Sequence, residues 1–343
     1  MFIIFVTFTA ALGVLTYLLR RRRLANVALL FFSLSLCLTG LEAYYRFLYA
    51  ESDGFGRLSK NFNDRYYRFD AYGLRASNLP PSETKPNLIV VGDSHVFGAG
   101  LKSTSERFSE RLAARYPALH VINLGLSGWD TKTETAQVAR YLGDTHAAIP
   151  LVVLTYFFND IEEDVTAADR ERLLPPTPPV EPTAVDRAMQ RLSNYSRFLE
   201  LFYYRIGYPR LVRDRLGQIL IFYKDPAITA AHLASLEQFR SVVEKQYNAR
   251  LLIVVLPFLH SEELLHRTEF YERFRKALDD HRFNYIDMQP VFARHPVRDL
   301  WVSRFDPHTN GFANQLVANA VIDYLTAHPD EIQRKIPTPP AAP

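Results

Sequence analysis

The sequence predicts an α/β fold with a doubly wound parallel sheet, preceded by two helices that cross a membrane. Short continuous runs of Val, Ile and Leu alternate with helical patterns about five times, which is the pattern of strands connected by crossover helices. Two long uncharged runs at the N-terminus predict the membrane helices. The chain is therefore expected to combine a membrane anchor with an α/β domain.

Composition excludes several classes of protein. Hydrophobic residues make up 48% and charged residues 22% of the 343 residues, as in an ordinary globular protein rather than a disordered or fibrous one. Lys and Arg number 40 against 37 Asp and Glu, but four positive charges form one run, Arg20–Arg23, which leaves 36 against 37. The sequence therefore lacks the basic surface that binds nucleic acid. The single cysteine, Cys37, excludes a disulfide framework and a cysteine-ligated zinc site.

The first 41 residues predict where the protein is located. Residues 1–19 and 24–41 carry no charged side chain, and each run approaches the ~20 residues that span a bilayer. A cleavable signal peptide would place its positive charges before the apolar run, whereas Arg20–Arg23 follow it. The positive-inside rule places this loop in the cytoplasm, so Met1 and everything after Glu42 face the periplasm or cell exterior. Two buried helices of a soluble protein are the alternative, but four consecutive arginines are costly to bury.

Five apolar runs predict buried parallel strands, because each run is continuous rather than alternating with polar residues. They lie at residues 87–92, 119–124, 149–157, 250–257 and 284–288. Helical patterns separate or follow them, at residues 105–115, 132–143, 228–247 and 262–280. A parallel sheet with helices on both faces follows from this alternation.

The same patterns divide the chain into segments. Residues 1–42 form the two membrane helices with the cytoplasmic Arg loop, 43–330 form the α/β domain, and 331–343 form a Pro-rich tail. Residues 160–227 separate the third and fourth strands by more than a normal crossover, which predicts an inserted lid or subdomain. Its aromatic and Arg-rich part, 194–215, is suited to sugar rings, to lipid headgroups or simply to packing.

Polar residues follow three of the predicted strands. Ligands of an open parallel sheet bind beyond the carboxyl ends of its strands. Residues 92–94 (GDS) follow the first strand, 123–128 (NLGLSG) end the second, and 159–160 (ND) follow the third. A fourth stretch, 306–310 (DPHTN), forms a loop ahead of a helical pattern at 312–326 and supplies a histidine and a carboxylate. A serine, turn glycines, an asparagine and a histidine are thus expected in one crevice.

These four stretches, in this order, resemble the four sequence blocks of the SGNH (GDSL-type) hydrolases, here of a membrane-anchored bacterial type. The resemblance covers residues 65–327 apart from the insertion. It implies a three-layer α/β/α, flavodoxin-like fold and hydrolysis of esters or thioesters without a metal. It also implies Ser94 as nucleophile, His308 as base, and an oxyanion hole made by the Ser94 amide, Gly128 and Asn159. Together with the two membrane helices, the resemblance implies that the protein lies in the bacterial inner membrane, with its catalytic domain in the periplasm or outside the cell.

Two positions depart from the family pattern. The third block usually has a glycine where Phe157 stands, and the fourth usually has an aspartate where Phe305 stands, three residues before the histidine. In some relatives the aspartate stands two residues before the histidine instead of three. The resemblance therefore assigns the third catalytic role to Asp306. The chemistry agrees with the assignment. A serine hydroxyl needs an imidazole to remove its proton, and that imidazole needs an acceptor on its other nitrogen.

Each site residue also has a structural explanation. Ser94 is suited to capping a helix, Gly128 to forming a turn, Asn159 to bridging loop backbones, and His308 to an exposed position beside a helix start. The histidines show no HExxH or comparable spacing, and the third glycine of a dinucleotide loop is missing after Gly98. Neither a metal nor another cofactor is therefore expected.

Three functions remain open. The first is a membrane-anchored serine esterase that removes acyl groups, including O-acetyl groups, from an envelope glycan or lipid. The second is an O-acyltransferase that modifies a polysaccharide, in which a sugar hydroxyl replaces water as the acceptor. The third is a catalytically silent scaffold. The presence of all block residues disfavours the third, whereas the first two use the same residues. The expected partners are therefore an acylated carbohydrate or lipid substrate and the membrane, and not nucleic acid.

Overall fold

The computed structural model describes the chain except for residues 1, 21–23, 53–58, 144, 175–183 and 333–343. Most of the predicted Arg20–Arg23 loop and of the 331–343 tail lies outside the described residues. The chain divides into two compact units: unit 1 comprises Met1–Arg65 and Thr177–Arg215, and unit 2 comprises Tyr66–Pro176 and Leu216–Pro343. The insertion predicted at 160–227 is thus divided between the two units.

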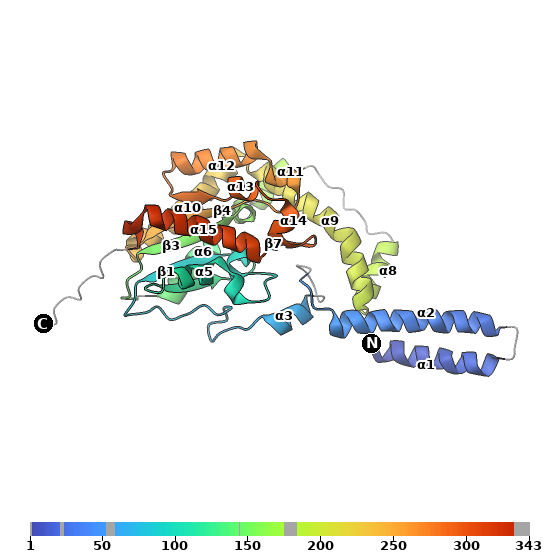
Figure 1. Cartoon of the computed structure of the whole chain (residues 1–343). Coiled ribbons are helices and arrows are strands. Elements are labelled where there is room, and N and C mark those ends of the chain that lie inside the picture. The colour runs from blue at the N-terminus through green and yellow to red at the C-terminus, as the bar shows by residue number, and fades with distance from the viewer. Residues whose placement is uncertain (1, 21–23, 53–58, 144, 175–183, 333–343) are drawn as a thin grey trace. The chain divides into compact units, whose positions relative to one another are not determined.

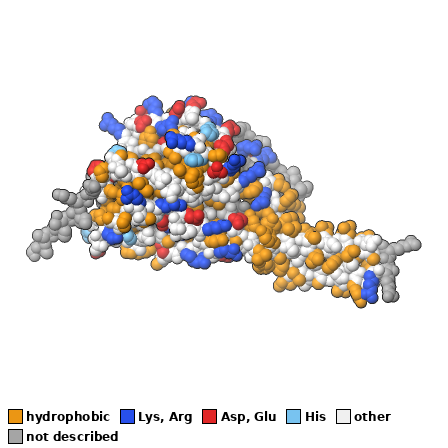
Figure 2. Space-filling model, viewed as in Figure 1, with side chains coloured by type: hydrophobic (Ala, Val, Ile, Leu, Met, Phe, Trp, Pro, Cys, Tyr) orange, Lys and Arg blue, Asp and Glu red, His pale blue; other side chains and the backbone are white. Residues whose placement is uncertain are grey.

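Unit 1 begins with a hairpin of two apolar helices, α1 (Phe2–Leu19) and α2 (Ala25–Ala43), and α2 continues into the π-helical segment η1 (Tyr44–Leu48). Both helices are long and apolar enough to cross a membrane. Large apolar side chains cover much of their surface (Figure 2), and Ile3 and Leu30 are 74% and 66% exposed. In water such a surface would be unfavourable, so the hairpin has the surface that a membrane anchor requires.

Small and hydroxyl-bearing residues hold the hairpin together. The Thr9 hydroxyl lies 2.6 Å from that of Ser35 and 2.8 Å from that of Thr39, which links the two helices. A Cβ added at Gly13 would lie 3.0 Å from the Phe32 ring, so the glycine allows the helices to approach closely. Small residues and interhelical hydroxyl pairs are typical of helices that pack in lipid.

A buried carboxylate joins the hairpin to part of the insertion. Glu42 is fully buried and accepts hydrogen bonds from Arg46 at 2.6 and 2.9 Å. It also accepts from the Ser196 hydroxyl at 2.8 Å and from the Phe198 amide at 3.2 Å, at the start of a helix. These contacts explain why residues 177–215 belong to unit 1. The insertion contains helices α7 (Ala167–Leu173), α8 (Ala184–Ser193) and α9 (Arg197–Phe222).

Unit 2 contains a five-stranded, fully parallel sheet with the order β2-β1-β3-β4-β5. Figure 1 shows β1, β3 and β4 of this sheet with helices around them. The strands are β1 (Asn87–Gly92), β2 (His120–Gly125), β3 (Leu151–Phe157), β4 (Arg250–Leu256) and β5 (Tyr285–Asp287). All five predicted strands and the predicted parallel α/β fold are therefore confirmed. Gly92 pairs with Gly125 on one side and with Thr155 on the other, so the neighbouring strands end at one edge of the sheet.

Helices cover both faces of the sheet, which is why its strands are apolar throughout. Helix α5 packs against α15, and α6 packs against α10. Leu88 and Val90 of β1 lie in the core beside α5 and α15, whereas the equally buried Ile89 and Val91 point to the other face. The helices are α5 (Phe108–Arg115), α6 (Thr131–Leu142), α10 (Pro226–Gln246), α11 (Glu262–Leu265), α12 (Thr268–Asp280) and α15 (Gly311–Ala327). The single helix predicted at 262–280 is thus two helices.

The segment predicted as a loop at 306–310 is mostly a strand. β6 (Trp301–Ser303) and β7 (Asp306–Thr309) pair in an antiparallel ribbon. The loop prediction was wrong because this ribbon is too short and too polar to give a strand pattern. Asn310 then caps α15, since its Oδ1 accepts a hydrogen bond from the Ala313 amide at 2.9 Å.

Candidate active site

Ser94 stands at the carboxyl end of β1, as the first residue of the short helix α4 (Ser94–Phe97). Asp93 caps this helix, and its Oδ1 accepts a hydrogen bond from the His95 amide at 2.8 Å. A Cβ added at Gly125, at the end of β2, would lie 2.3 Å from the Phe97 nitrogen. Only glycine therefore allows β2 to approach the helix that carries Ser94.

His308 and Asp306 of β7 lie beside Ser94. The Ser94 Oγ is 2.8 Å from His308 Nε2, and His308 Nδ1 is hydrogen-bonded to Asp306 Oδ1. Asp306 is fully buried, and its Oδ1 also accepts from the His308 amide at 3.3 Å. With the proton on Nδ1, the histidine donates to the carboxylate and its Nε2 accepts from the serine hydroxyl. The structure thus joins the three side chains that the sequence assigned to catalysis in one chain of hydrogen bonds.

The electrostatic environment makes His308 more basic. Burial alone lowers the pKa of His308, but the charge of Asp306, its hydrogen bond and the charge of Asp93 outweigh burial, so the pKa lies above 6.5. The neighbouring His95 shows the opposite shift. Burial and the positive charges of His308 and His260 lower the pKa of His95 well below 6.5. The neutral His95 ring packs 4.7 Å from the Phe157 ring, and His308 is the stronger proton acceptor of the pair.

The two residues proposed as oxyanion donors, Gly128 and Asn159, follow the strands on either side of β1. Gly128 follows β2 with φ of +87°, a conformation that favours glycine, and no atom lies within 4 Å of an added Cβ. Asn159 lies in the 3₁₀ segment η3 (Phe158–Asp164), directly after β3. Its Oδ1 is buried without a hydrogen-bond partner in the described part of the chain. The strand ends place both residues at the edge of the sheet that carries Ser94.

Buried carboxyl groups beneath this edge were not expected from the sequence. Asp160 and Glu134 are almost fully buried; one Asp160 oxygen accepts from Thr131 at 3.1 Å, whereas neither Glu134 oxygen has a partner among the described residues. Burial, and then the charges of neighbouring carboxylates that include Asp93, raise the pKa of both groups well above its usual value. The protonated form of each group is therefore favoured more than in an exposed carboxyl group. No pattern in the sequence indicates this burial, since a glutamate in α6 resembles a residue of a solvated helix face.

One group of residues has the spacing of metal ligands. Glu163, Asp164 and His232 each place a donor atom within 4.8 Å of the others. However, Lys132 Nζ lies 2.5 Å from one Asp164 oxygen, and His232 Nδ1 lies 2.8 Å from the other. An ammonium group and a hydrogen bond thus already compensate the central carboxylate. The group carries no argument for a metal, and the absence of a cofactor remains a prediction.

Comparison with known proteins gives similarity in structure only. The sequence matches no protein-family model and no curated protein sequence. TesA is 14% identical with a TM-score of 0.42, covering 70% of this chain and 98% of its own. A G-D-S-L family lipolytic protein from Veillonella parvula is 13% identical, with a TM-score of 0.39 and coverages of 70% and 98%. A carbohydrate acetylesterase family member from Sinorhizobium meliloti is 15% identical, with a TM-score of 0.39 and coverages of 71% and 98%.

The motifs that carry Ser94, Asn159 and His308 follow the order of the SGNH blocks, and each lies where the resemblance implies, at a strand end or just before the last helix. In the order of these motifs, the chain resembles the SGNH (GDSL-type) hydrolases.

Proposed function

We propose that the protein is a membrane-anchored serine esterase of the SGNH type. The hydrogen-bonded chain from Ser94 through His308 to the buried Asp306 carries this proposal, because it supplies nucleophile, base and orienting carboxylate in one geometry. The apolar hairpin supports the anchor. An acyl ester of an envelope glycan or lipid is the substrate class within reach of such a domain, and O-acetyl groups are the smallest of these acyl groups.

The geometry gives a definite sequence of proton transfers. As Ser94 Oγ attacks the carbonyl carbon, its proton passes to His308 Nε2, and the imidazolium is stabilised by Asp306. The carbonyl oxygen becomes an oxyanion, which the Ser94 and Gly128 amides and the Asn159 side chain stabilise. His308 then returns the proton to the departing alkoxide, leaving Ser94 acylated. Water, deprotonated by the same Nε2, releases the acid and restores the serine.

Hydrolysis of p-nitrophenyl esters by the full chain in detergent micelles tests the proposal. The expected result is serine-dependent release of p-nitrophenol, fastest with the acetyl ester if O-acetyl groups are the natural substrates. Folded protein without turnover on acetyl, butyryl or longer esters would contradict an esterase function.

Replacing Asn159 with alanine should reduce kcat by roughly 10²–10³-fold, because one oxyanion donor is lost. The Asn159 oxygen has no partner within the described residues, so folding should be unaffected. Steady-state kinetics with p-nitrophenyl acetate and a thermal melt measure the two effects. Asn319→Ala, on the exposed side of α15, is the matched control and should retain full activity. Unchanged turnover in Asn159→Ala would mean that this residue has no part in the oxyanion hole.

The orientation in the membrane makes a separate prediction. A reporter enzyme that functions only outside the cytoplasm should be active when fused after residue 60 and inactive when fused after residue 23, because arginines hold the interhelical loop inside. Activity of the second fusion but not the first would reverse the topology. It would also exclude glycans and lipids of the envelope as substrates.

A further inference from the structure

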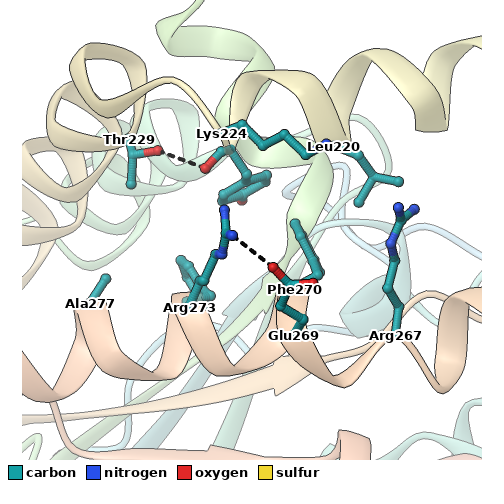
Figure 3. A pocket seen from close by; sticks show the side chains of 10 residues that line it. Leu220, Lys224, Thr229, Arg267, Glu269, Phe270, Arg273 and Ala277 are labelled. Carbon is teal, nitrogen blue, oxygen red and sulfur yellow. Dashed lines mark hydrogen bonds and ion pairs between the residues drawn. The ribbon is translucent and has the colours of Figure 1, made fainter.

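A pocket separate from the proposed catalytic residues lies in unit 2, between the C-terminal end of α9, the start of α10 and helix α12 (Figure 3). Its volume is about 380 Å³, within the range of small-molecule sites, and neither Ser94 nor His308 lines it. Phe270 and Arg273 of α12, and Arg267 just before it, point toward Leu220 and Lys224, which come from the end of α9 and the turn after it (Figure 3). The esterase chemistry described above leaves this pocket without a role.

Aromatic side chains form a fixed wall of the pocket. The ring of Tyr223 lies 5.3 Å from that of Phe270 and 5.8 Å from that of Phe274, edge to face in both pairs. The Tyr223 hydroxyl is hydrogen-bonded to that of Tyr156, which lies 2.8 Å from His232 Nε2. Buried hydrogen bonds therefore hold the tyrosine in place. An aromatic wall held in this way suits the apolar face of a planar or ring-shaped ligand.

The rim of the pocket has an excess of positive charge. Arg273 is paired with Glu269 at 2.7 Å, but no hydrogen bond or ion pair is found for the Lys224 or Arg267 side chains among the described residues. Two cations thus remain without a counter-ion beside an aromatic wall. An anionic group would supply that counter-ion, and guanidinium and ammonium groups together can bind a carboxylate or a phosphate.

The pocket is in contact with the segment that carries the proposed oxyanion donor. The Phe270 ring lies 4.8 Å from that of the buried Phe158, the residue before Asn159. Phe258 packs against Phe158 and also against Phe157, at 5.4 Å in each pair. Phe158 and Phe258 are buried, so this packing belongs to the protein interior and places the pocket near the segment that carries Asn159. A second part of an extended substrate that binds at Ser94 would reach the pocket along the protein surface.

We propose that this pocket binds an anionic sugar unit of the acylated substrate, with the sugar ring on Phe270 and its carboxylate or phosphate on Lys224 and Arg267. The inference rests on the proposed esterase function for the identity of the whole substrate, but binding to the pocket does not depend on catalysis. The substrate is then an acidic glycan rather than a neutral one. The pocket contributes to binding of the glycan and not to the chemical step.

Calorimetric titration of the full chain in micelles tests this proposal. The probes are trigalacturonate, neutral galactotriose, mannose 6-phosphate and inorganic phosphate. We expect one of the two charged sugars to bind at least about tenfold more tightly than galactotriose, which identifies the anion as carboxylate or phosphate. Arg267→Gln and Lys224→Gln should each weaken that binding about tenfold. The matched control Arg115→Gln removes an exposed arginine of α5, outside the pocket, and should leave binding unchanged.

The aromatic wall has its own test. Phe270→Leu should weaken binding of the charged sugar while leaving binding of inorganic phosphate unchanged. Equal binding of galactotriose and the charged sugars would overturn the proposal, as would unchanged binding in both cation variants. If inorganic phosphate binds as tightly as either charged sugar, the pocket is a simple anion site, and this result would also overturn the proposal. If the protein binds the charged sugar but has no esterase activity, the proposed esterase function is refuted and the proposed binding site is retained.

Discussion

Replacing Ser94 with alanine is expected to lower kcat for p-nitrophenyl acetate by roughly 10⁴–10⁶-fold, because the attacking oxygen is removed. His308→Ala should have a similar effect, since the hydroxyl 2.8 Å from Nε2 then has no proton acceptor. The double variant should be no worse than either single variant, because the two side chains act as a unit. Steady-state kinetics on the three purified variants measure these effects.

A control histidine separates loss of the base from loss of a histidine in general. His266 is exposed on the surface beside α11, so His266→Ala should retain full activity. Losses that multiply in the Ser94 and His308 double variant would show that His308 acts on something other than Ser94. Full activity in Ser94→Ala would refute the serine mechanism.

Replacing Asp306 with asparagine should lower kcat by about 10⁴-fold, because the asparagine amide can donate to Nδ1 and favour the wrong histidine tautomer. The buried site makes the effect large, since no water reaches the carboxylate to replace it. Asp323→Asn, on the exposed surface of α15, is the matched control and should be active. An Asp306→Asn enzyme with normal kcat would remove Asp306 from the catalytic group.

The pH profile gives the same variant a second readout. The base must be neutral, so activity falls as the pH drops through the pKa of His308, which lies above 6.5 in the native protein. The charge and hydrogen bond of Asp306 raise the pKa of His308 against the effect of burial, so this pKa should be lower in the Asp306→Asn variant. The residual activity of that variant should therefore persist to lower pH than the activity of the unaltered protein. A profile of kcat/KM from about pH 5 to 9 measures the midpoint. An unchanged midpoint would show that Asp306 does not control the protonation of His308.

The sheet was predictable, and the proposed catalytic residues could be selected, because each left a local signal. Both faces of the sheet are covered, so its strands appear as continuous apolar runs, and the strand predicted at 87–92 coincides with β1. Ser94 and Asn159 directly follow strands, where ligands of parallel sheets bind. Asp306 could be proposed as the partner of His308 because it lies only two residues before the histidine in the sequence.

Other features depend on contacts between distant segments and left no such signal. Glu42 binds Ser196, 154 residues further along the chain, which joins part of the insertion to the membrane hairpin. Glu134 looks like a solvated helix residue until the fold buries it behind the sheet. Lys224 and Arg267 line the same pocket although they are far apart in the sequence, and neither residue lies in a recognisable motif.

Labelling with a fluorophosphonate tests the central claim most directly. In this reaction Ser94 Oγ displaces fluoride from phosphorus while His308 accepts the hydroxyl proton, so the adduct marks a serine activated by its base. Peptide mass spectrometry of the labelled full chain should find one adduct, on Ser94, absent in Ser94→Ala and formed far more slowly in His308→Ala. Folded protein that stays unlabelled, or that carries the adduct on another residue, would contradict the proposed mechanism.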